Sequence, residues 1–276
     1  MPKRKRVQQA ATTLAEIADP FRLYELAVQY APAEIDFVDG AFKALRNRSP
    51  KLLREDFCGT AQVCCEWVGR RKGNRAIGLE PDEEALEWGR RHNLGRLTAE
   101  QQGRVVLIHG DVLELETPPV DLVVAMNFSY WRFKERARLR AYFERVHASL
   151  VTDGILFLDA YGGYQACQEI TEEQPIDEGR FTYLWEQARY DPISGHLLCY
   201  IHFRFSDDSR LERAFRYDWR LWTLPELRDL LREAGFQRVM VYWQGYDEAG
   251  EPDGVFEPVQ EGEAEASWVC YLSAEK

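Results

Sequence analysis

The chain has 276 residues, with 35 basic and 46 acidic side chains, a formal net charge of −11 and 45% hydrophobic residues. This length can bury a full core without disulfide or metal staples, which predicts one large domain or one domain with an insertion. The aromatic content of 13% excludes a largely disordered acidic protein. The negative balance argues against a nucleic-acid partner, because duplex binders cluster cations that displace counterions.

The expected location follows from the absence of apolar spans and from the cysteines. No stretch approaches the roughly 20 apolar residues that cross a bilayer, so we expect no membrane partner. The basic run at residues 3–6 is followed by no apolar signal core and is typical of a solvated tail. The six cysteines show no paired CxxC spacing, which indicates reduced thiols in a cytoplasmic protein.

Residues 1–50 are predicted to form a tail followed by a helical cap. Apolar residues from Leu14 to Tyr30 keep approximately helical spacing, with a break at Asp19-Pro20. A second helix is predicted by four apolar residues at similar spacing, namely Ile35, Val38, Phe42 and Leu45.

Residues 51–162 form the predicted core, in which short apolar runs alternate with amphipathic segments. The predicted strands cover residues 52–57, 76–79, 105–109, 121–126 and 155–160, and the helices between them cover 61–71, 82–93 and 134–150. This alternation indicates a parallel sheet with helices on both faces. Right-handed crossovers then place ligand sites at the carboxyl ends of the strands, near the switch in strand order.

Residues 163–222 are predicted to form a small antiparallel β insertion after the fifth strand. Phe215, Tyr217 and Trp219 alternate with charged residues, and this period of two suits a strand with two unlike faces. Residues 223–276 then complete the core sheet. They contain a predicted helix over 224–234, a strand over 238–243, an acidic loop over 247–265 and a last strand over 267–272.

Polar residues follow the predicted core strands at their carboxyl ends. The first strand runs through Glu55 into a turn around Gly59, where a small residue lets the backbone approach a ligand. Glu80 ends the second strand, where a carboxylate can accept hydrogen bonds from two ribose hydroxyls. Asp111 and Asn127 follow the third and fourth strands. A helix cap is the expected role of the nearby Asp82, but so many polar residues in register indicate a ligand site.

With these motifs the sequence resembles the class I S-adenosylmethionine-dependent methyltransferases. The resemblance covers about residues 52–162 through motifs. It implies an α/β fold with a Rossmann-like, mostly parallel seven-stranded sheet whose antiparallel last strand inserts beside strand 238–243. It implies S-adenosyl-L-methionine as the cofactor. The implied cofactor-binding residues are Glu55, Phe57, Cys58, Gly59, Thr60, Glu80, Pro81, Asp111, Val112, Asn127 and Phe128.

The turn after the first strand departs from the family pattern. Phe57 and Ala61 stand at two of the three glycine positions, so we expect a bulkier turn in which Phe57 presses on the methionine portion of the cofactor. A competing interpretation is a nicotinamide dinucleotide site, which requires G-x-G-x-x-G beside the pyrophosphate. Only Gly59 is present here, and Asp56 would add negative charge beside a dianion.

The substrate side is predicted from position and composition. Eleven aromatic residues lie between 181 and 222, where many small-molecule methyltransferases place a lid; a well-packed sheet is the plainer explanation. Methyl transfer needs an aligned nucleophile and a dry site, with a general base only if the nucleophile arrives protonated. The expected substrate-binding residues are Tyr130, Trp131, Tyr161 and Arg220. No catalytic residue is assigned; the weak candidates are His202, Tyr24 and Tyr161, and no metal site is expected.

The resulting hypothesis is a cytoplasmic methyltransferase that moves a methyl group to a nitrogen, oxygen or sulfur of a small-molecule acceptor. A first alternative keeps the chemistry with a protein acceptor, a basic peptide attracted by the eight acids of residues 247–265. A second alternative is a non-catalytic S-adenosylmethionine-binding or interaction module, motivated by Phe57 and Ala61. Lids in such enzymes often meet across dimers, but no residue pattern establishes a homo-oligomer.

Overall fold

The computed structural model describes residues 12–250 and 252–276, so the basic run at residues 3–6 lies outside the described residues. Three helices come first, α1 (Leu14–Ile17), α2 (Pro20–Ala27) and α3 (Ala31–Arg46). The Asp19 carboxylate accepts hydrogen bonds from the N–H groups of Phe21 and Arg22, and Pro20 occupies the first turn of α2, where its missing N–H costs nothing. The predicted break at Asp19-Pro20 is therefore confirmed.

The larger of two sheets has the strand order β11-β10-β12-β5-β4-β1-β2-β3. Five parallel strands form its first part, namely β1 (Leu52–Asp56), β2 (Arg75–Glu80), β3 (Val105–His109), β4 (Val120–Ala125) and β5 (Leu150–Gly162). Three antiparallel pairings add β10 (Arg238–Tyr246), β11 (Pro252–Val259) and β12 (Trp268–Glu275). β12 lies between β5 and β10, which confirms the expected antiparallel last strand.

The prediction of a loop throughout residues 247–265 is wrong, and the sheet has eight strands instead of seven. Pro252–Val259 forms β11, which pairs with β10 at the edge of the sheet. Proline, glycine and acids argue against a central strand, but an edge strand pairs on one side only and tolerates them. The Phe256 ring anchors β11 by packing on Phe37 and Tyr271, at centroid distances of 5.9 Å and 4.4 Å.

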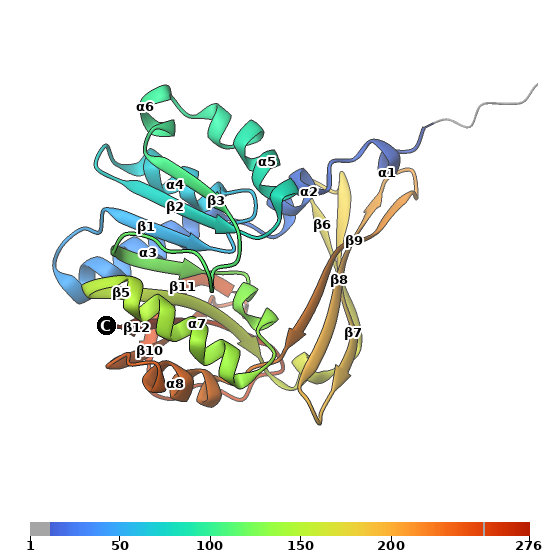
Figure 1. Cartoon of the computed structure of the whole chain (residues 1–276). Helices are drawn as coiled ribbons and strands as arrows, with labels where there is room; N and C mark the ends of the chain where they lie inside the picture. Colours follow the sequence, from blue (N-terminus) through green and yellow to red (C-terminus); the bar gives the residue numbers. More distant parts are fainter. Residues whose placement is uncertain (1–11, 251) are drawn as a thin grey trace, which may run out of the picture.

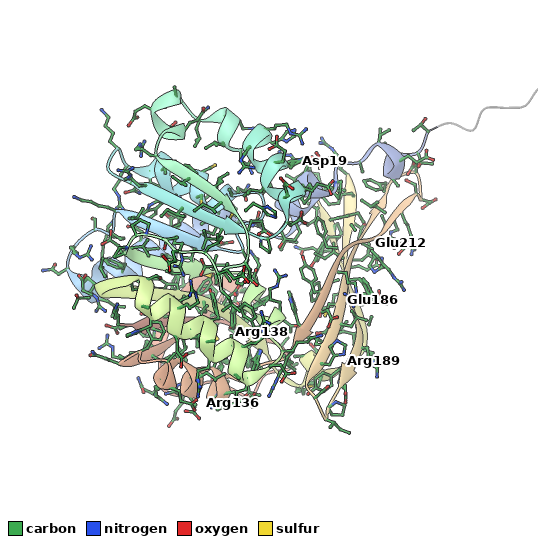
Figure 2. The ribbon with its side chains drawn as sticks, in the orientation of Figure 1. Asp19, Arg136, Arg138, Glu186, Arg189 and Glu212 are labelled. Carbon is green, nitrogen blue, oxygen red and sulfur yellow. The ribbon has the colours of Figure 1, made fainter. Side chains whose placement is uncertain are left out.

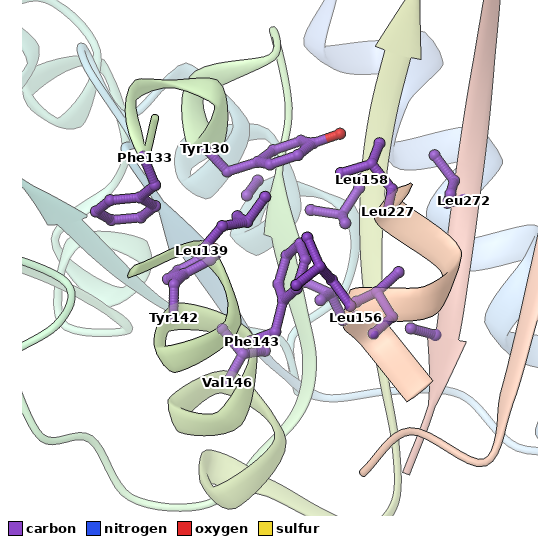
Figure 3. Close-up of a cluster of buried hydrophobic side chains, with 14 of the residues drawn as sticks. Tyr130, Phe133, Leu139, Tyr142, Phe143, Val146, Leu156, Leu158, Leu227 and Leu272 are labelled. Atoms are coloured by element: carbon purple, nitrogen blue, oxygen red, sulfur yellow. The ribbon is translucent and has the colours of Figure 1, made fainter. Parts of the chain in front are cut away.

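Helices cover both faces of this sheet (Figure 1). One face carries α3, α4 (Gln62–Arg70) and α5 (Glu83–His92), and the other carries α7 (Arg136–Ser149) and α8 (Leu224–Glu233). On the second face, Leu139 and Phe143 of α7 and Leu227 of α8 pack with Leu156 and Leu158 of β5 (Figure 3). The short elements are α6 (Ala99–Gln102) and three 3₁₀ helices, η1 (Leu94–Arg96), η2 (Ser129–Arg132) and η3 (Tyr164–Cys167).

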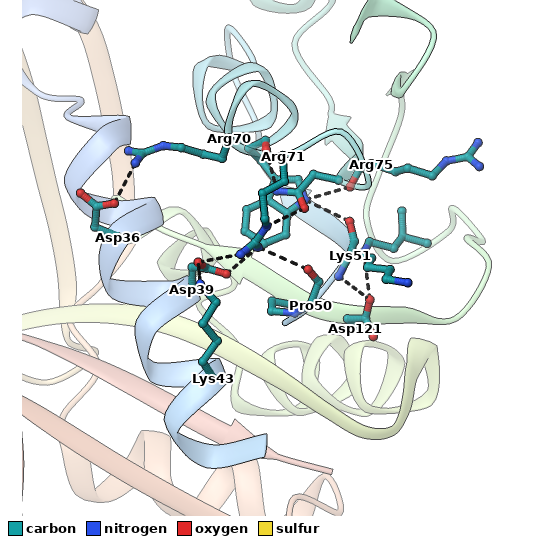
Figure 4. Close-up of polar contacts among 12 residues, drawn as sticks. Asp36, Asp39, Lys43, Pro50, Lys51, Arg70, Arg71, Arg75 and Asp121 are labelled. Carbon is teal, nitrogen blue, oxygen red and sulfur yellow. Dashed lines mark hydrogen bonds and ion pairs between the residues drawn. The ribbon is translucent and has the colours of Figure 1, made fainter. Parts of the chain in front are cut away.

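Ion pairs and backbone bonds attach α3 to the start of the sheet (Figure 4). Asp39 of α3 pairs with Arg71 at 2.6 Å, just beyond the end of α4. The Asp121 carboxylate accepts hydrogen bonds from the N–H groups of Lys51 and Leu52 at 2.8 Å and 2.9 Å, where β1 begins. These contacts set the register of β1 against its neighbours. They therefore set the position of the turn that follows β1.

The second sheet is antiparallel, in the order β6-β7-β8-β9. Its strands are β6 (Ile170–Ile176), β7 (Phe181–Asp191), β8 (His196–Phe205) and β9 (Arg210–Arg220), which confirms an antiparallel insertion between β5 and α8. β6 was not predicted, because its polar composition hides the pattern of an edge strand. Within the described ranges, no helix combines the length and the apolar character needed to cross a membrane.

Candidate functional site

The turn between β1 and α4 holds three alternate residues in the left-handed backbone region. The φ angles are 61° at Phe57, 51° at Gly59 and 58° at Ala61. For Phe57 and Ala61 this conformation costs about 1 kcal/mol each, and such strain persists where the surroundings impose it. These are the positions at which the resemblance expects glycines, so the turn keeps a glycine-type path with larger side chains.

Glu80, at the end of β2, is hydrogen-bonded to the backbone of this turn. Its carboxylate accepts hydrogen bonds from the N–H groups of Gly59 at 2.7 Å and Asp82 at 2.9 Å. Burial raises the pKa of Glu80, although these two hydrogen bonds act in the opposite direction. Asp82 caps α5 by accepting hydrogen bonds from the N–H groups of Glu84 and Ala85, which is the role expected from the sequence.

Helix α2 supports the same turn through Glu25, a residue that sequence reasoning missed. The Glu25 carboxylate accepts hydrogen bonds from the Thr60 hydroxyl at 2.8 Å and from the Asn93 amide at 2.6 Å. The same amide donates to the Thr60 carbonyl at 2.9 Å. Thr60 and Cys58 are buried, so they shape the turn from behind. The sequence signal for Glu25 was a single acid among the apolar residues of a helix.

The two acids of β1 point to opposite faces of the sheet. The Glu55 carboxylate accepts the N–H of Cys64 at 3.0 Å, at the start of α4, and burial raises the pKa of Glu55 to about 8. Asp56 instead forms a buried ion pair with Arg54 at 2.8 Å and accepts the Tyr142 hydroxyl at 2.9 Å. Within the described chain Glu55 has no cationic partner. Asp56 is therefore a structural residue, whereas Glu55 is a buried carboxyl held by the start of α4 without an ion pair, and it does not line the cavities described below.

Asp159 of β5 positions the loop that follows β4. Its carboxylate accepts hydrogen bonds from the N–H groups of Asn127 and Phe128, at 2.6 Å and 2.9 Å. Both of these residues have a φ of 55°, so Asp159 stabilises a strained pair. Burial raises the pKa of Asp159 to about 7. The sequence contained the relevant signal, an acid near the carboxyl end of the predicted strand 155–160, in the same position as Glu80 on its strand.

Two cavities meet where the main sheet faces the second sheet. The first, here called the cleft, has a volume of about 1230 Å³ and lies against Glu80, Pro81 and Arg132. The second, here called the aromatic chamber, has a volume of about 240 Å³. The two cavities share four of their lining residues, namely Tyr24, Asn127, Tyr217 and Trp219.

A third cavity of about 330 Å³ adjoins the cleft, because Pro81 and Arg132 line both. Its remaining walls include Phe57, Asp111 and Val112. The Arg132 guanidinium lies 5.6 Å from the centroid of the Phe57 ring. The structure thus gathers most of the predicted cofactor residues around adjoining cavities, namely Phe57, Glu80, Pro81, Asp111, Val112, Asn127 and, in the aromatic chamber, Phe128.

The predicted substrate residues are distributed differently. Tyr161 lines the aromatic chamber. Tyr130 and Trp131 have no exposed surface, and the Tyr130 hydroxyl donates to the Asp159 carbonyl at 2.7 Å. Arg220 pairs with Glu226 at 2.9 Å and does not line the three cavities described above. Tyr130 and Trp131 therefore support the wall from behind.

Of the three candidate catalytic residues, two line a cavity and one does not. Tyr24 lines both cavities and Tyr161 lines the aromatic chamber. His202 contacts Glu212 at 2.5 Å and Glu186 at 2.8 Å. Both acids lie on the side of the second sheet that faces away from the main sheet (Figure 2). His202 therefore lies on the opposite face of the second sheet from the aromatic chamber and does not line it.

Comparisons with known proteins find solved structures of similar architecture, although sequence comparisons find no match. No protein-family model matches the sequence, and no curated protein matches it. An S-adenosylmethionine-dependent methyltransferase from Clostridium acetobutylicum superposes with a TM-score of 0.65 at 16% identity, covering 91% of this chain and 96% of that one. An amino pentose methyltransferase from Micromonospora echinaspora, solved with S-adenosylmethionine bound, gives 0.65 at 14% identity, covering 92% and 95%.

A sugar N-methyltransferase from Streptoalloteichus gives a TM-score of 0.61 at 15% identity, covering 92% of each chain. Each of these three superpositions covers more than nine-tenths of this chain. The chain has the fold of the class I S-adenosylmethionine-dependent methyltransferases.

Proposed function

We propose that the chain binds S-adenosylmethionine in the cleft and transfers its methyl group to a nitrogen, oxygen or sulfur of a small molecule in the aromatic chamber. The observation that carries this proposal is the junction of the two cavities at Tyr24, Asn127, Tyr217 and Trp219. One cavity is polar and acidic, and the other is mostly apolar. A donor and an acceptor bound on either side of this junction would meet at it.

The cleft fits a cofactor that carries hydroxyls and positive charge. Each carboxylate oxygen of Glu80 keeps a lone pair beyond its backbone hydrogen bond, so it can accept from ribose hydroxyls. Among the described residues, six acids line the cleft against three arginines, so its lining carries a net negative charge. A cationic ligand would offset this charge. Val112 would flank the adenine in the third cavity, and because Phe57 lines the same cavity we place its ring near the adenine instead of the methionine portion expected from the sequence.

S-adenosylmethionine, when bound, supplies a methyl group on a positively charged sulfur. The acceptor's lone pair forms the new bond while the carbon–sulfur bond breaks, leaving its electron pair on sulfur, and the acceptor's proton passes to water. The rings at the junction exclude water and suit a positive charge that is dispersed in the transition state. Asp159 contributes by holding the backbone of Asn127 at the junction.

The size of the aromatic chamber suits a small acceptor. Its volume of about 240 Å³ holds a small molecule or a single amino-acid side chain, so a peptide acceptor would have to leave its backbone outside. The structural neighbours include proteins described as sugar N-methyltransferases and amino pentose methyltransferases, which supports the same choice. All six cysteines carry free thiols, in keeping with a cytoplasmic location.

The test is calorimetric titration with S-adenosylmethionine and S-adenosylhomocysteine. We expect both to bind, and Glu80→Ala to weaken binding at least about tenfold, or 1.4 kcal/mol. Glu66→Ala, which removes a partly exposed acid of α4 that pairs with Arg70 away from the cleft, is the matched control. No binding at millimolar ligand would overturn the proposal. Binding without release of S-adenosylhomocysteine across nitrogen, oxygen and sulfur acceptors would instead support the non-catalytic module.

A further inference from the structure

The walls of the aromatic chamber are made mostly of rings. Six rings besides Tyr24 line it, namely Phe128, Tyr161, Tyr183, Trp185, Tyr217 and Trp219. They contact one another: the Trp185 centroid lies 5.7 Å from that of Tyr217 and 6.1 Å from that of Trp219. On the opposite side the rings of Phe128 and Tyr161 pack edge to face, with 4.7 Å between their centroids. A ligand in the aromatic chamber is therefore surrounded by aromatic faces and edges.

Glu172 is the one charged residue among the described residues that line the aromatic chamber, and no lysine, arginine or histidine joins it there. It lies on the edge strand β6, directly opposite Trp185 in the ladder with β7, so the two side chains share a face. The next residue, Glu173, points to the other face and pairs with Arg204 at 2.6 Å. No ion pair with Glu172 occurs within the described ranges, and its side chain is exposed to water.

The end of the segment 247–265 leads directly into the wall of the aromatic chamber. Ser267 and Val269 of the C-terminal segment line it, and the carbonyl of Ala266 accepts the N–H of Gln165 at 3.0 Å. Glu265, the last acid of the segment 247–265, precedes these residues directly. Its carboxylate accepts a hydrogen bond from the Tyr246 hydroxyl at 2.7 Å and does not line the aromatic chamber, so Glu172 is the acid that faces a bound ligand. The acidic segment noted in the sequence thus ends beside the aromatic chamber.

Aromatic faces carry negative electrostatic potential and bind ammonium groups more strongly than they bind neutral hydroxyls or thiols. We propose that the aromatic chamber selects an amine, whose protonated nitrogen lies against the rings with Glu172 as its counter-charge. This inference rests on the proposed function and narrows its acceptor atom from nitrogen, oxygen or sulfur to nitrogen. Anionic acceptors are disfavoured at the same site because no cation lines it.

The carboxylate also gives the proton a route out of the aromatic chamber. An ammonium has no free lone pair, so it first transfers one proton to the Glu172 carboxylate, which passes it to water. The neutral amine's lone pair then forms the nitrogen–carbon bond as the carbon–sulfur bond breaks, and that electron pair stays on sulfur. The product is a methylated ammonium and a neutral thioether, so charge and atoms balance.

The binding test compares choline with its uncharged carbon isostere, dimethylbutanol, which has the same shape. Each is titrated into the full chain, with and without S-adenosylhomocysteine, and followed by tryptophan fluorescence. We expect choline to bind at least about tenfold more tightly than the alcohol. Glu172→Gln should reduce this preference but keep the part that the rings supply, whereas Glu173→Gln, on the outer face, should leave it unchanged. Equal affinity for the two probes in the unaltered chain would overturn the proposal.

An activity test separates the proposal from the proposed function. Benzylamine, benzyl alcohol and benzyl thiol share one body and differ in the acceptor atom, and release of S-adenosylhomocysteine reports methyl transfer to each. We expect turnover with the amine to exceed turnover with the other two at least about tenfold. A preference for oxygen or sulfur would overturn the choice of nitrogen while leaving methyl transfer intact. Failure of the cofactor titration would overturn the proposed function, while the choline comparison on the cofactor-free chain would still test the aromatic chamber.

Discussion

The turn after β1 keeps a left-handed backbone at Phe57 and Ala61, where glycine would adopt it more readily. Packing offsets the strain at Phe57, because its ring contacts Phe133 and Tyr142 at centroid distances of 5.9 Å and 5.8 Å. The Phe57 side chain therefore forms part of the wall of the third cavity as well as part of the turn. The turn also packs closely against α5, and this contact limits which side chains α5 can carry there.

Gly89 of α5 provides the closest of these contacts. A Cβ at this position would lie 2.2 Å from the carbonyl oxygen of Thr60, which is backbone and cannot move aside. Gly89→Ala should therefore destabilise the protein by about 1–3 kcal/mol and weaken cofactor binding. Gly69→Ala in α4, where a Cβ meets nothing within 4 Å, should be neutral or stabilise by up to about 1 kcal/mol. Urea denaturation of both variants measures this, and equal effects would contradict it.

Glu34 gives the stability of the cofactor-free protein a pH dependence. Burial raises its pKa from 4.5 to about 7, so between these values the folded protein holds a proton that the unfolded chain releases. Its contribution to the free energy of unfolding therefore falls as the pH rises from about 5 to 7, by up to about 3 kcal/mol, and is constant above.

Glu34→Gln removes the titrating carboxyl. This variant should therefore flatten the dependence of the free energy of unfolding on pH between about 5 and 7. Asp36→Asn, an exposed position on the same helix, should leave it unchanged. Urea denaturation at pH 5 and pH 8 provides the comparison. If the Glu34→Gln profile matched that of the parent, the role of Glu34 would be refuted.

Helix α2 connects the two sheets at the side of the cleft. The Trp88 indole of α5 donates to Asp19 at 2.6 Å, just before α2. Phe21 packs between Trp88 and Phe215 of β9, at 5.9 Å and 6.0 Å between centroids, and Tyr24 reaches Phe215 at 4.9 Å. The predicted cap thus contacts α5 and the second sheet, as well as the turn after β1 through Glu25.

The link from α2 to the turn is testable through Glu25. Glu25→Ala leaves the Thr60 hydroxyl and the Asn93 amide without a shared acceptor, and buried groups in this state cost about 1–3 kcal/mol. We expect weaker S-adenosylmethionine binding together with lower stability. Glu16→Ala, on the exposed α1, serves as the control. Unchanged affinity in Glu25→Ala would show that α2 does not position the turn.

At the scale of the whole molecule, the cleft lies between two sheets that meet through α2 and the loop after β4. A ligand that contacts both sides binds the folded chain and not the unfolded one, so it raises the apparent stability. S-adenosylhomocysteine at a hundredfold excess over its Kd should add about 2.7 kcal/mol, which corresponds to several degrees in Tm. Differential scanning calorimetry measures this shift, and its absence at saturating ligand would contradict the proposed site.

The sequence by itself determined the parallel core, its helices and the polar residues at the strand ends. Periodicity and the alternation of strand and helix depend on local hydrophobic pattern, and parallel strands bring Glu80, Asp111 and Asn127 to one edge of the sheet whatever the details of packing. The antiparallel insertion was also predictable, because alternating aromatic and charged residues have a period of two.

Only the tertiary structure decided which side chains face the cavities. Tyr130 and Trp131 follow β4 in sequence but point into the core, and His202 shares a strand with chamber residues but faces outward. β11 and β6 were hidden because edge strands carry the polar composition of loops. Glu25, Glu34 and Asp159 matter through partners or burial far away in sequence, and no local pattern records such contacts. The function of each residue at this site therefore depends on packing between elements, which hydrophobic periodicity does not specify.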